Sequence, residues 1–532
     1  MTLKQDGNPI YVVAITLVAA LGGLLFGYDT AVISGAVKSL QAFFIDSLAN
    51  DAEKAQLVVS QYRMAVAVVV VLIDLALTGI FLRLYGKKKG GILVSILIVL
   101  SVIVLVRFFS NAIVFDENTA NSIKGFTISS ALVGCIIGGA AGGFISKSIG
   151  RKGGLILAAA LFILSAIGSS IPEHMNFFGT EKIVTFIIYR IIGGMGVGLA
   201  SMLSPMYIAE MAPANIRGKL VSWNQFAIVF GMLVVYFVNY FIASQGDEQW
   251  LINTGWRWMF ASEVIPAGLF LIMLSFVPET PRYLVLKGNE SKASGVLTKI
   301  LGEAKAADVL RNIKETLVEK SVPWLSFGGL VLIIGILLSV FQQFVGINAV
   351  LYYAPEIFRN MGSGTDTALL QTIIVGLINM AFTIIAILTV DKFGRKPLMI
   401  IGGVGMAVSM FLLGSSFYLE KVGLGALIFM LLYTASFAMS WGPVTWVLLS
   451  EIFPNSIRGA MSIAVAAQWI ANLIISWTFP MMNDNSYLTS VFHHGFSYWI
   501  YGLMSILAAL FVWKMVPETK GKTLEEMENL WK

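Results

Sequence analysis

Long apolar segments alternate with short polar ones along almost the whole chain. A membrane-crossing helix needs about 20 predominantly apolar residues, and fourteen segments reach or approach that length. They lie at residues 10–37, 57–82, 90–110, 124–146, 153–171, 183–209, 220–243, 257–277, 325–354, 367–390, 397–417, 424–449, 460–480 and 495–516. This pattern predicts an all-α polytopic membrane protein.

One stretch interrupts the apolar pattern near the middle of the chain. Residues 281–322 are rich in Lys and Glu, with Leu297, Ile300, Leu310 and Ile313 among them at helical spacing. Amphipathic helices of this kind lie in water. The expected organisation is an N-terminal membrane bundle, cytoplasmic amphipathic helices, a C-terminal membrane bundle and a cytoplasmic tail, at residues 1–280, 281–322, 323–517 and 518–532.

The two membrane halves repeat three motifs in the same order. SIGRKGG at 148–154 corresponds to KFGRKPL at 392–398, AEMAPANIRG at 209–218 to SEIFPNSIRG at 450–459, and VPETPR at 277–282 to VPETKG at 516–521. The intervals between the motifs also match. Three ordered motifs at matching spacing indicate an internal repeat, and repeated bundles with a substrate site between them are a known transporter plan.

Composition and charge narrow the class of protein further. The chain is 57% hydrophobic and only 12% charged, which is too little charge to cover a soluble protein of this size. The net charge of +6 is not gathered on a soluble domain, so no nucleic-acid partner is expected. Clusters of Lys and Arg, as at 83–89 and 147–152, fall on one side if the spans alternate. By the positive-inside rule that side is cytoplasmic and holds both termini.

Cysteine and histidine point to no further chemistry. Cys135 is the single cysteine and lies in an apolar segment, where it is expected to be a small core residue. His174, His493 and His494 form no catalytic or metal-ligand pattern. The sequence therefore suggests no enzyme activity, cofactor, metal or obligate protein partner, and leaves the lipid bilayer and a small solute as the expected partners.

Several long motifs resemble the sugar porter family of the major facilitator superfamily, and within it the proton-coupled D-xylose transporters. They are GGLLFGYDTAVISG, RIIGGMGVG, FQQFVGINAVLYYAPE and SWGPVTWVLLSEIFPNSIRG, and the resemblance covers residues 10–40 and 124–530. It implies a major facilitator fold of two six-helix bundles in the bacterial inner membrane. Residues 57–110 depart from the family and are expected to form an inserted transmembrane hairpin, which preserves the topology because it crosses twice.

Asp29 is the only charge between residues 10 and 37. A charge at the bilayer centre costs at least about 3 kcal/mol, so it needs a partner, water or a proton. Arg190 stands equally alone in its apolar segment and is the expected partner. A titratable carboxylate beside a fixed cation can couple proton binding to conformation, and the family resemblance assigns proton coupling to this position. The alternative is a static buried ion pair.

A set of amides and aromatic residues lies in apolar helices of both halves. Unpaired buried amides cost a few kcal/mol, whereas a sugar offers them hydroxyls and offers its C–H faces to indole rings. The resemblance implies that the sugar is bound by Gln225, Gln342, Gln343, Asn348, Asn379, Trp446 and Gln468, and that Phe26, Tyr352, Gly442 and Trp469 form the pocket wall or gate. Gly346 and Pro355 are expected to break the helix that carries Asn348 and Tyr352.

The repeated motifs also suggest a cytoplasmic gate of salt bridges. By resemblance its members are Arg151, Glu210, Arg217, Arg395, Glu451 and Arg458, with Glu210 expected near Arg217 and Glu451 near Arg458. Asp391 stands four residues before Arg395, but the matching position of the first half is Lys147. One gate contact is therefore expected to be missing there. Isolated surface ion pairs are the alternative.

The sequence thus favours a proton-coupled sugar symporter, most closely one for D-xylose. Two alternatives stay open: a proton-independent facilitator of the same fold, and a non-transporting sugar sensor. Asp74, in the inserted hairpin, is expected to be structural, with a second proton site as the alternative. Pentose or hexose preference, proton stoichiometry and oligomeric state are left undetermined by the sequence.

Overall fold

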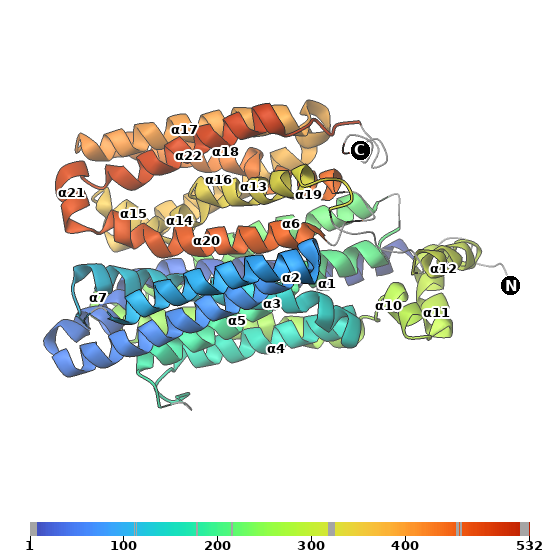
Figure 1. Ribbon diagram of the computed structural model, residues 1–532, viewed down its shortest axis with the longest axis horizontal. Coiled ribbons are helices and arrows are strands. Elements are labelled where there is room, and N and C mark those ends of the chain that lie inside the picture. Colours follow the sequence, from blue (N-terminus) through green and yellow to red (C-terminus); the bar gives the residue numbers. More distant parts are fainter. Residues whose placement is uncertain are drawn as a thin grey trace.

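Long helices run side by side through the computed structural model (Figure 1), which describes residues 8–110, 112, 114–176, 179–213, 216–317, 325–453, 457, 460–521 and 531. Within these residues, thirteen helices are long and apolar enough to cross a membrane. One of them, α2 (Ala52–Ser110), turns back at Gly86, where φ is 69° and ψ is 176°. Its two arms account for the fourteenth expected segment, and the all-α membrane fold is confirmed.

The first half holds six crossings besides α2. They are α1 (Pro9–Leu40), α3 (Glu117–Ser148), α4 (Gly150–Ser170), α5 (Lys182–Met211), α6 (Arg217–Ala243) and a composite crossing of α7 (Glu248–Trp250), η3 (Leu251–Gly255), α8 (Trp256–Ala261) and α9 (Val264–Phe276). Short helices η1 (Gln41–Ile45) and η2 (Asp46–Asn50) join α1 to α2. The six crossing helices carry apolar residues on most of their faces, which is typical of membrane-spanning helices.

The second half also holds six crossings, several of them broken. They are α13 (Leu330–Phe344) with α14 (Ile347–Tyr352) and α15 (Ala354–Asn360), α16 (Thr365–Phe393), α17 (Arg395–Tyr418), α18 (Leu424–Met439) with α19 (Trp441–Ile452), α20 (Met461–Asn483) and α22 (Gly495–Met515). The short helix α21 (Ser486–Phe492) precedes α22. Three polar helices, α10 (Pro281–Leu286), α11 (Glu290–Leu301) and α12 (Glu303–Leu317), link the halves where water-exposed helices were expected.

The internal repeat is visible in the packing. Within the first half α1 packs on α6, and the corresponding α13 packs on α20. Between the halves α3 packs on α20, and the corresponding α16 packs on α6. Close approach is possible because small residues lie at the crossings: a Cβ on Gly27 would fall 1.9 Å from the carbonyl oxygen of Ile228 on α6. Small residues at such contacts are typical of membrane helices.

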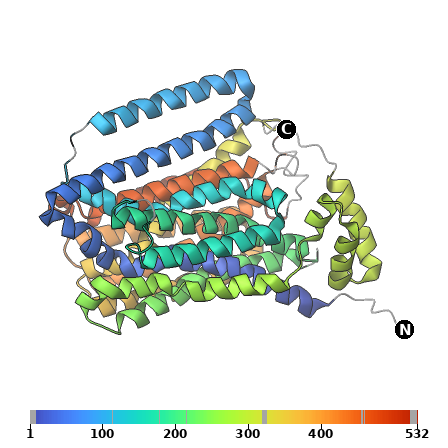
Figure 2. The same ribbon diagram turned by 90° about the horizontal axis from the view of Figure 1, so that it is seen from below.

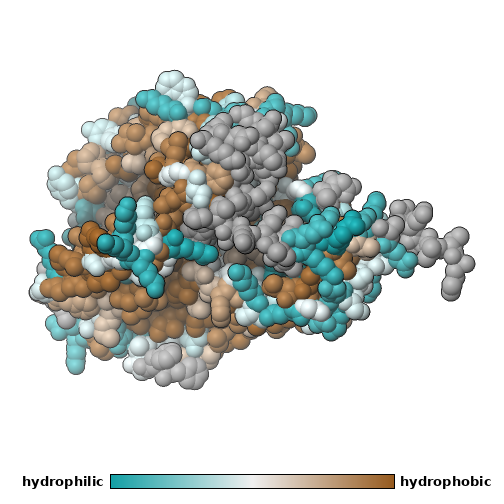
Figure 3. Space-filling view, turned by 45° about the vertical axis from the view of Figure 1, so that its right-hand side comes forward, coloured by the Kyte–Doolittle hydropathy of each residue, from teal (hydrophilic) through white to brown (hydrophobic). Residues whose placement is uncertain are grey.

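The two ends of the bundle differ. The described N-terminus lies against α11, where the Asn8 amide donates to the Lys299 carbonyl at 3.1 Å, and the Trp531 indole donates to the Ile452 carbonyl at 3.0 Å. We call this end, which also carries α10–α12, the terminal end, and the opposite end, with α7, α15 and α21, the distal end (Figure 1). Hydrophilic side chains gather around α10–α12, while apolar side chains cover much of the flanks (Figure 3).

The inserted hairpin stands at the margin of the bundle, with its second arm outermost (Figure 2). The first arm is anchored near its distal start by buried Val58, Val59 and Tyr62, and the Tyr62 hydroxyl is 2.8 Å from that of Ser122 on α3. The most apolar window of the hairpin buries none of its residues within the protein. Most of the hairpin surface is therefore not covered by the rest of the protein.

Candidate functional site

The two lone charges of the apolar segments meet in the interior. Asp29 of α1 and Arg190 of α5 are 0% and 1% exposed, and Arg190 Nη1 donates to Asp29 Oδ1 at 2.6 Å. Arg190 Nη2 also donates to the backbone carbonyl of Asp29 at 3.0 Å, and the guanidinium lies 5.4 Å from the ring centre of Phe260. The expected pair is thus formed, with both charges removed from water.

A third charged residue, Glu263, joins this pair. It is 0% exposed, lies between α8 and α9, and interacts electrostatically with both Asp29 and Arg190. Within the described residues, both oxygens of Glu263, Oδ2 of Asp29 and Nε of Arg190 have no hydrogen-bond partner. One guanidinium and two carboxyl groups therefore share this part of the interior, with Arg190 bonded directly to Asp29. Because an ionised trio would carry a net negative charge in the membrane, the site has capacity for a proton.

Sequence reasoning missed Glu263, although a signal was present. It is the only acidic residue of the apolar segment 257–277, which is the same feature that drew attention to Asp29. The neighbouring Ser262 is held by Tyr28, whose hydroxyl is 2.7 Å away. Gly193 leaves room for the cluster, since a Cβ there would lie 3.1 Å from Asp29 Oδ1 and closer still to Ser165.

Four of the expected sugar-binding amides form one connected chain in the second half. Asn348 donates to Gln343 at 2.5 Å, and Gln343 donates to Gln342 at 3.4 Å. Gln468 of α20 donates to the same Gln342 oxygen at 2.5 Å. Gln342 in turn donates to the carbonyls of Trp441 and Gly442 at 2.9 and 3.1 Å, so α13, α14, α19 and α20 are joined by neutral polar groups.

The broken helix places these amides. Gly346 has a φ of 95° and separates α13 from α14, as the sequence predicted. A Cβ on Gly346 would fall 2.5 Å from the ring of Tyr501, so the break is also packed. Beyond it, Asn348 and Tyr352 lie on α14, and the Tyr236 hydroxyl of α6 donates to the Leu351 carbonyl at 3.3 Å. This short helix therefore contacts both halves.

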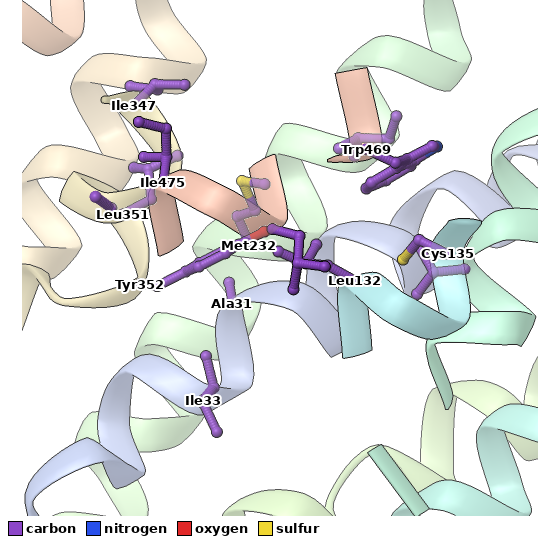
Figure 4. Packing of buried hydrophobic residues seen from close by; sticks show 14 of the residues in the cluster. Ala31, Ile33, Leu132, Cys135, Met232, Ile347, Leu351, Tyr352, Trp469 and Ile475 are labelled. Atoms are coloured by element: carbon purple, nitrogen blue, oxygen red, sulfur yellow. The ribbon is translucent and has the colours of Figure 1, made fainter. Parts of the chain in front are cut away.

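Aromatic residues from both halves lie beside the amides. The rings of Phe26 on α1 and Trp469 on α20 are 5.6 Å apart between centroids. Figure 4 shows Tyr352 of α14 close to Ala31 of α1, with Trp469 on the same side as Cys135 of α3. Of the other expected sugar contacts, Gln225 and Trp446 are half-buried on α6 and α19, and Asn379 is buried on α16.

Ion pairs at the terminal end repeat in the two halves. Arg151 bonds to Glu210 at 2.7 Å and Arg395 to Glu451 at 2.8 Å. Glu210 therefore contacts Arg151, whereas its expected neighbour, Arg217, is exposed at the start of α6. Arg458 lies outside the described residues.

Each of these two ion pairs, Arg151 with Glu210 and Arg395 with Glu451, joins residues of the same half. In the second half Asp391 also lies 2.9 Å from Arg395. The matching residue of the first half is Lys147, which is exposed. The first half therefore lacks this contact, as the sequence predicted.

The repeated Pro-Glu-Thr motifs have a structural role that the sequence did not reveal. Glu279 accepts hydrogen bonds from the backbone amides of Arg151 and Lys152 at the start of α4, and Glu518 accepts from those of Arg395 and Lys396 at the start of α17. Carboxylates stabilise the unpaired amides of a helix N-terminus. The glutamates differ, because burial raises the pKa of Glu279.

Glu518 has the opposite shift. Burial also opposes its charge, but hydrogen bonds from four backbone amides outweigh burial and lower its pKa.

Within the described ranges, no group of three His, Cys, Asp or Glu side chains could hold a metal ion. A groove of about 640 Å³ lies on the flank, lined by residues that include Ile242, Trp250, Trp258 and Ile265. Its lining is mostly apolar, in contrast to the amide-lined interior.

Comparison with known proteins supports the resemblance found in the motifs. Residues 15–114 and 102–531 match the family described as "Sugar (and other) transporter". The chain is 53% identical to the D-xylose-proton symporter of Escherichia coli strain K12, over 99% of this chain and 97% of that protein. It is 38% identical to the glucose facilitated diffusion protein of Zymomonas mobilis, over 100% of this chain and 99% of the relative.

Solved structures agree with the sequence comparison. The inward-open form of the xylose transporter XylE from E. coli superposes with a TM-score of 0.77 at 52% identity, covering 98% of this chain and all of that one. The proton:xylose symporter XylE bound to 6-bromo-6-deoxy-D-glucose superposes with a TM-score of 0.74 at 53% identity, covering 99% and 100%. The family is one of transporters and not of enzymes, as expected from the sequence, and this chain belongs to the sugar transporter family.

Proposed function

We propose that this protein is a proton-coupled sugar symporter that takes up D-xylose by alternating access. The observation that carries the proposal is the buried cluster of Asp29, Arg190 and Glu263, in which one fixed cation faces two carboxylates. The relatives named above include a D-xylose-proton symporter at 53% identity. Family membership supports sugar transport, and the cluster supports the coupling of that transport to protons.

The proton acts through Asp29. When Asp29 is ionised, it neutralises Arg190 and ties α1 to α5. When it takes up a proton, this attraction weakens, and Arg190 turns toward Glu263 as its remaining counter-charge. Proton binding thereby changes how α1, α5 and the α8–α9 segment are held together, which is the differential interaction that a conformational change requires.

The sugar lies between the two halves. Gln342, Gln343, Asn348 and Gln468 now form hydrogen bonds with one another, and a sugar hydroxyl can replace those contacts. Among the described residues, Oε1 of Gln468 has no hydrogen-bond partner and is open to a sugar hydroxyl. Gln225, Asn379 and Trp446 contribute from α6, α16 and α19, and Gly442 offers its backbone. Phe26 and Trp469 bound the pocket, and Tyr352 on α14 closes its outer side.

The remaining groups serve the movement. Arg151, Glu210, Arg217, Arg395, Glu451 and Arg458 form the gate at the terminal end. That end is cytoplasmic, because basic clusters gather there, and the protein crosses a bacterial inner membrane with both termini inside. Lipid, the sugar and H⁺ are its partners, and residues 57–110 are a membrane hairpin beside the first bundle.

Uptake by proteoliposomes tests the proposal. Wild-type protein and Asp29→Asn are compared for uptake of labelled D-xylose, with and without an inward proton gradient. We expect the gradient to drive wild-type accumulation above equilibrium, and Asp29→Asn to lose accumulation while it retains sugar exchange. Wild-type uptake that stops at equilibrium in vesicles shown to be proton-tight would refute symport.

A facilitator of the same fold is the second candidate. Its support is the glucose facilitated diffusion protein of Z. mobilis, which is 38% identical to this chain over its whole length. In this case Asp29 and Arg190 form a fixed ion pair, and the same experiment shows equal uptake with and without the gradient. If the protein takes up other sugars but not D-xylose, the proposed substrate is wrong and the transporter class still holds.

A further inference from the structure

A buried lysine joins the two halves at the distal end. Lys124, near the start of α3, has a side chain that is only 4% exposed. Its ammonium lies 2.5 Å from Glu356 on α15 and 2.7 Å from Asp484, directly after α20. We call Lys124, Glu356 and Asp484 the distal triad. Lys124 belongs to the first half and both carboxylates to the second, so these ion pairs connect the bundles.

Further hydrogen bonds surround the distal triad and also join the first half to the second. The Asn121 side chain donates to the backbone carbonyl of Asp484 at 3.3 Å. Glu117 accepts from both the amide and the hydroxyl of Ser486, each at 2.6 Å. Asn485 donates to Asn118 at 3.1 Å. All of these run from the first turns of α3 to the second half, so the distal ends of the halves are closed on each other.

The triad differs from a surface salt bridge in its burial. Exposed pairs contribute little to stability, whereas a lysine removed from water depends strongly on its partners, and breaking such a pair leaves uncompensated charge. Its partners are available only while the halves touch, because Lys124 has them on the opposite half. The triad therefore favours the distally closed state selectively, and it would contribute nothing once the halves separate and water enters.

The triad is also connected to the sugar site through the chain. Glu356 lies on α15, which follows α14 after Tyr353. Asn348 and Tyr352, assigned above to the pocket and its outer side, are on α14. Movement of α14 away from the first half must therefore draw Glu356 away from Lys124. Loss of the triad and opening of the pocket toward the distal side are parts of one motion.

We propose that Lys124 is a positioning residue of the transport cycle, which sets the balance between distally open and distally closed states. This inference rests on the proposed function only in that the two bundles rock against each other. It assigns a role to a charge that takes no part in binding the sugar or the proton. Removing the Lys124 charge shifts the population toward the state open to the outside.

Cysteine labelling tests the proposal without added sugar and without a measurement of transport. The single cysteine, Cys135, is replaced by serine, and Thr127→Cys places a thiol one turn deeper on α3, at a residue that is 2% exposed. Intact cells are treated with a membrane-impermeant maleimide. We expect Lys124→Met to accelerate labelling at Thr127→Cys about tenfold, as a shift of this size in a two-state population allows.

The chain offers a matched control. Lys182 is also a distal lysine, but its partner Glu173, at 3.8 Å, belongs to the same half. Lys182→Met should therefore leave labelling unchanged. Lys124→Arg keeps the positive charge and should be labelled nearly as slowly as the background protein, which carries only Cys135→Ser and Thr127→Cys. Labelling of Lys124→Met within about twofold of the background, a difference too small to indicate a shifted population, would overturn the proposal.

Two further variants keep the proposal testable if Lys124→Met does not reach the membrane. Glu356→Gln and Asp484→Asn each remove one carboxylate and leave Lys124 with the other, so both should accelerate labelling to a smaller degree. Unchanged labelling in both, with normal amounts of protein in the membrane, would overturn the role of the triad. Faster labelling of these variants, together with a wild-type protein that takes up no D-xylose, would refute the proposed function and leave the role of the triad in place.

Discussion

Arg190 donates to Asp29 at 2.6 Å across the interface of α5 and α1, and Glu263 interacts electrostatically with both. This makes the two ends of the ion pair unequal. Arg190 has Glu263 as a second carboxylate nearby, whereas Asp29 depends on Arg190 as its cation. The energetics of the pair should reflect this inequality.

We therefore expect Arg190→Leu to destabilise the protein more than Asp29→Asn. Arg190→Leu leaves two carboxylates without a cation, and breaking a buried pair from one side costs about 3–5 kcal/mol. Asp29→Asn leaves Arg190 with Glu263 as its counter-ion, and should cost clearly less. Thermal denaturation of the purified variants in detergent measures the difference.

The double variant Arg190→Leu/Glu263→Gln serves as the control for this prediction. It removes one of the two orphaned carboxylates and should recover part of the melting temperature lost in Arg190→Leu. Equal melting temperatures for Arg190→Leu and Asp29→Asn would show that Glu263 does not compensate Arg190.

The amide chain predicts a loss of sugar affinity when Gln468, its member on α20, is removed. Gln468→Ala deletes a donor to Gln342 and a potential sugar contact, and loss of a buried hydrogen-bonding group costs about 1–3 kcal/mol, or roughly 5- to 150-fold in affinity. Isothermal titration with D-xylose measures this change. Gln371→Ala is the control, because the Gln371 side chain bonds to Ser363 near the start of α16.

An unchanged affinity in Gln468→Ala would remove Gln468 from the sugar site. A similar loss in Gln371→Ala would point instead to a general effect of amide removal on the bundle.

Asp74 should have little effect on transport. Its carboxylate accepts a hydrogen bond from Ser101 at 3.0 Å, which joins the two arms of the inserted hairpin. Because this contact lies within the hairpin, Asp74→Asn should keep gradient-driven accumulation within about twofold of the wild type, since amide and carboxylate both accept from a hydroxyl. Uptake by proteoliposomes measures it, with Asp29→Asn as the comparison. Loss of accumulation in Asp74→Asn would instead make Asp74 a second proton site.

Glu518 predicts a pH-dependent contribution to stability. Its pKa is lowered from the ordinary value of 4.5, so folding favours the charged form. The resulting stabilisation is complete above the unfolded-state pKa and is lost as pH falls through the lower folded-state pKa. Glu518→Gln should reduce the stability at pH 7 by the free energy typical of a helix cap, about 0.5–2 kcal/mol. This loss should appear as a lower melting temperature.

The same variant should differ less from the wild type as the pH falls below 4.5. Melting curves of both proteins over a pH series provide the measurement. A difference that grows under acid would mean that the protonated form of Glu518 is the stabilising one, contrary to the contacts with the start of α17.

The sequence by itself determined the membrane class, the positions of the crossings and the internal repeat. These follow from local properties, because an apolar stretch of sufficient length must span the bilayer as a helix. The hairpin at 57–110, the break at Gly346 and the exceptional positions of Asp29 and Arg190 could be predicted for the same reason. Each is marked by a residue type that is costly in its immediate surroundings.

Tertiary structure alone decided which of these residues meet. Glu263 joins Asp29 and Arg190 only because the α8–α9 segment packs against α1, and Lys124 finds Glu356 and Asp484 more than 200 positions away in the chain. The pairing of Glu210 with Arg151 is likewise set by helix packing and not by nearness in the sequence. The sequence shows which charges lie in apolar segments and therefore need a partner. The fold determines which residue that partner is, because ion pairing depends on distance in space.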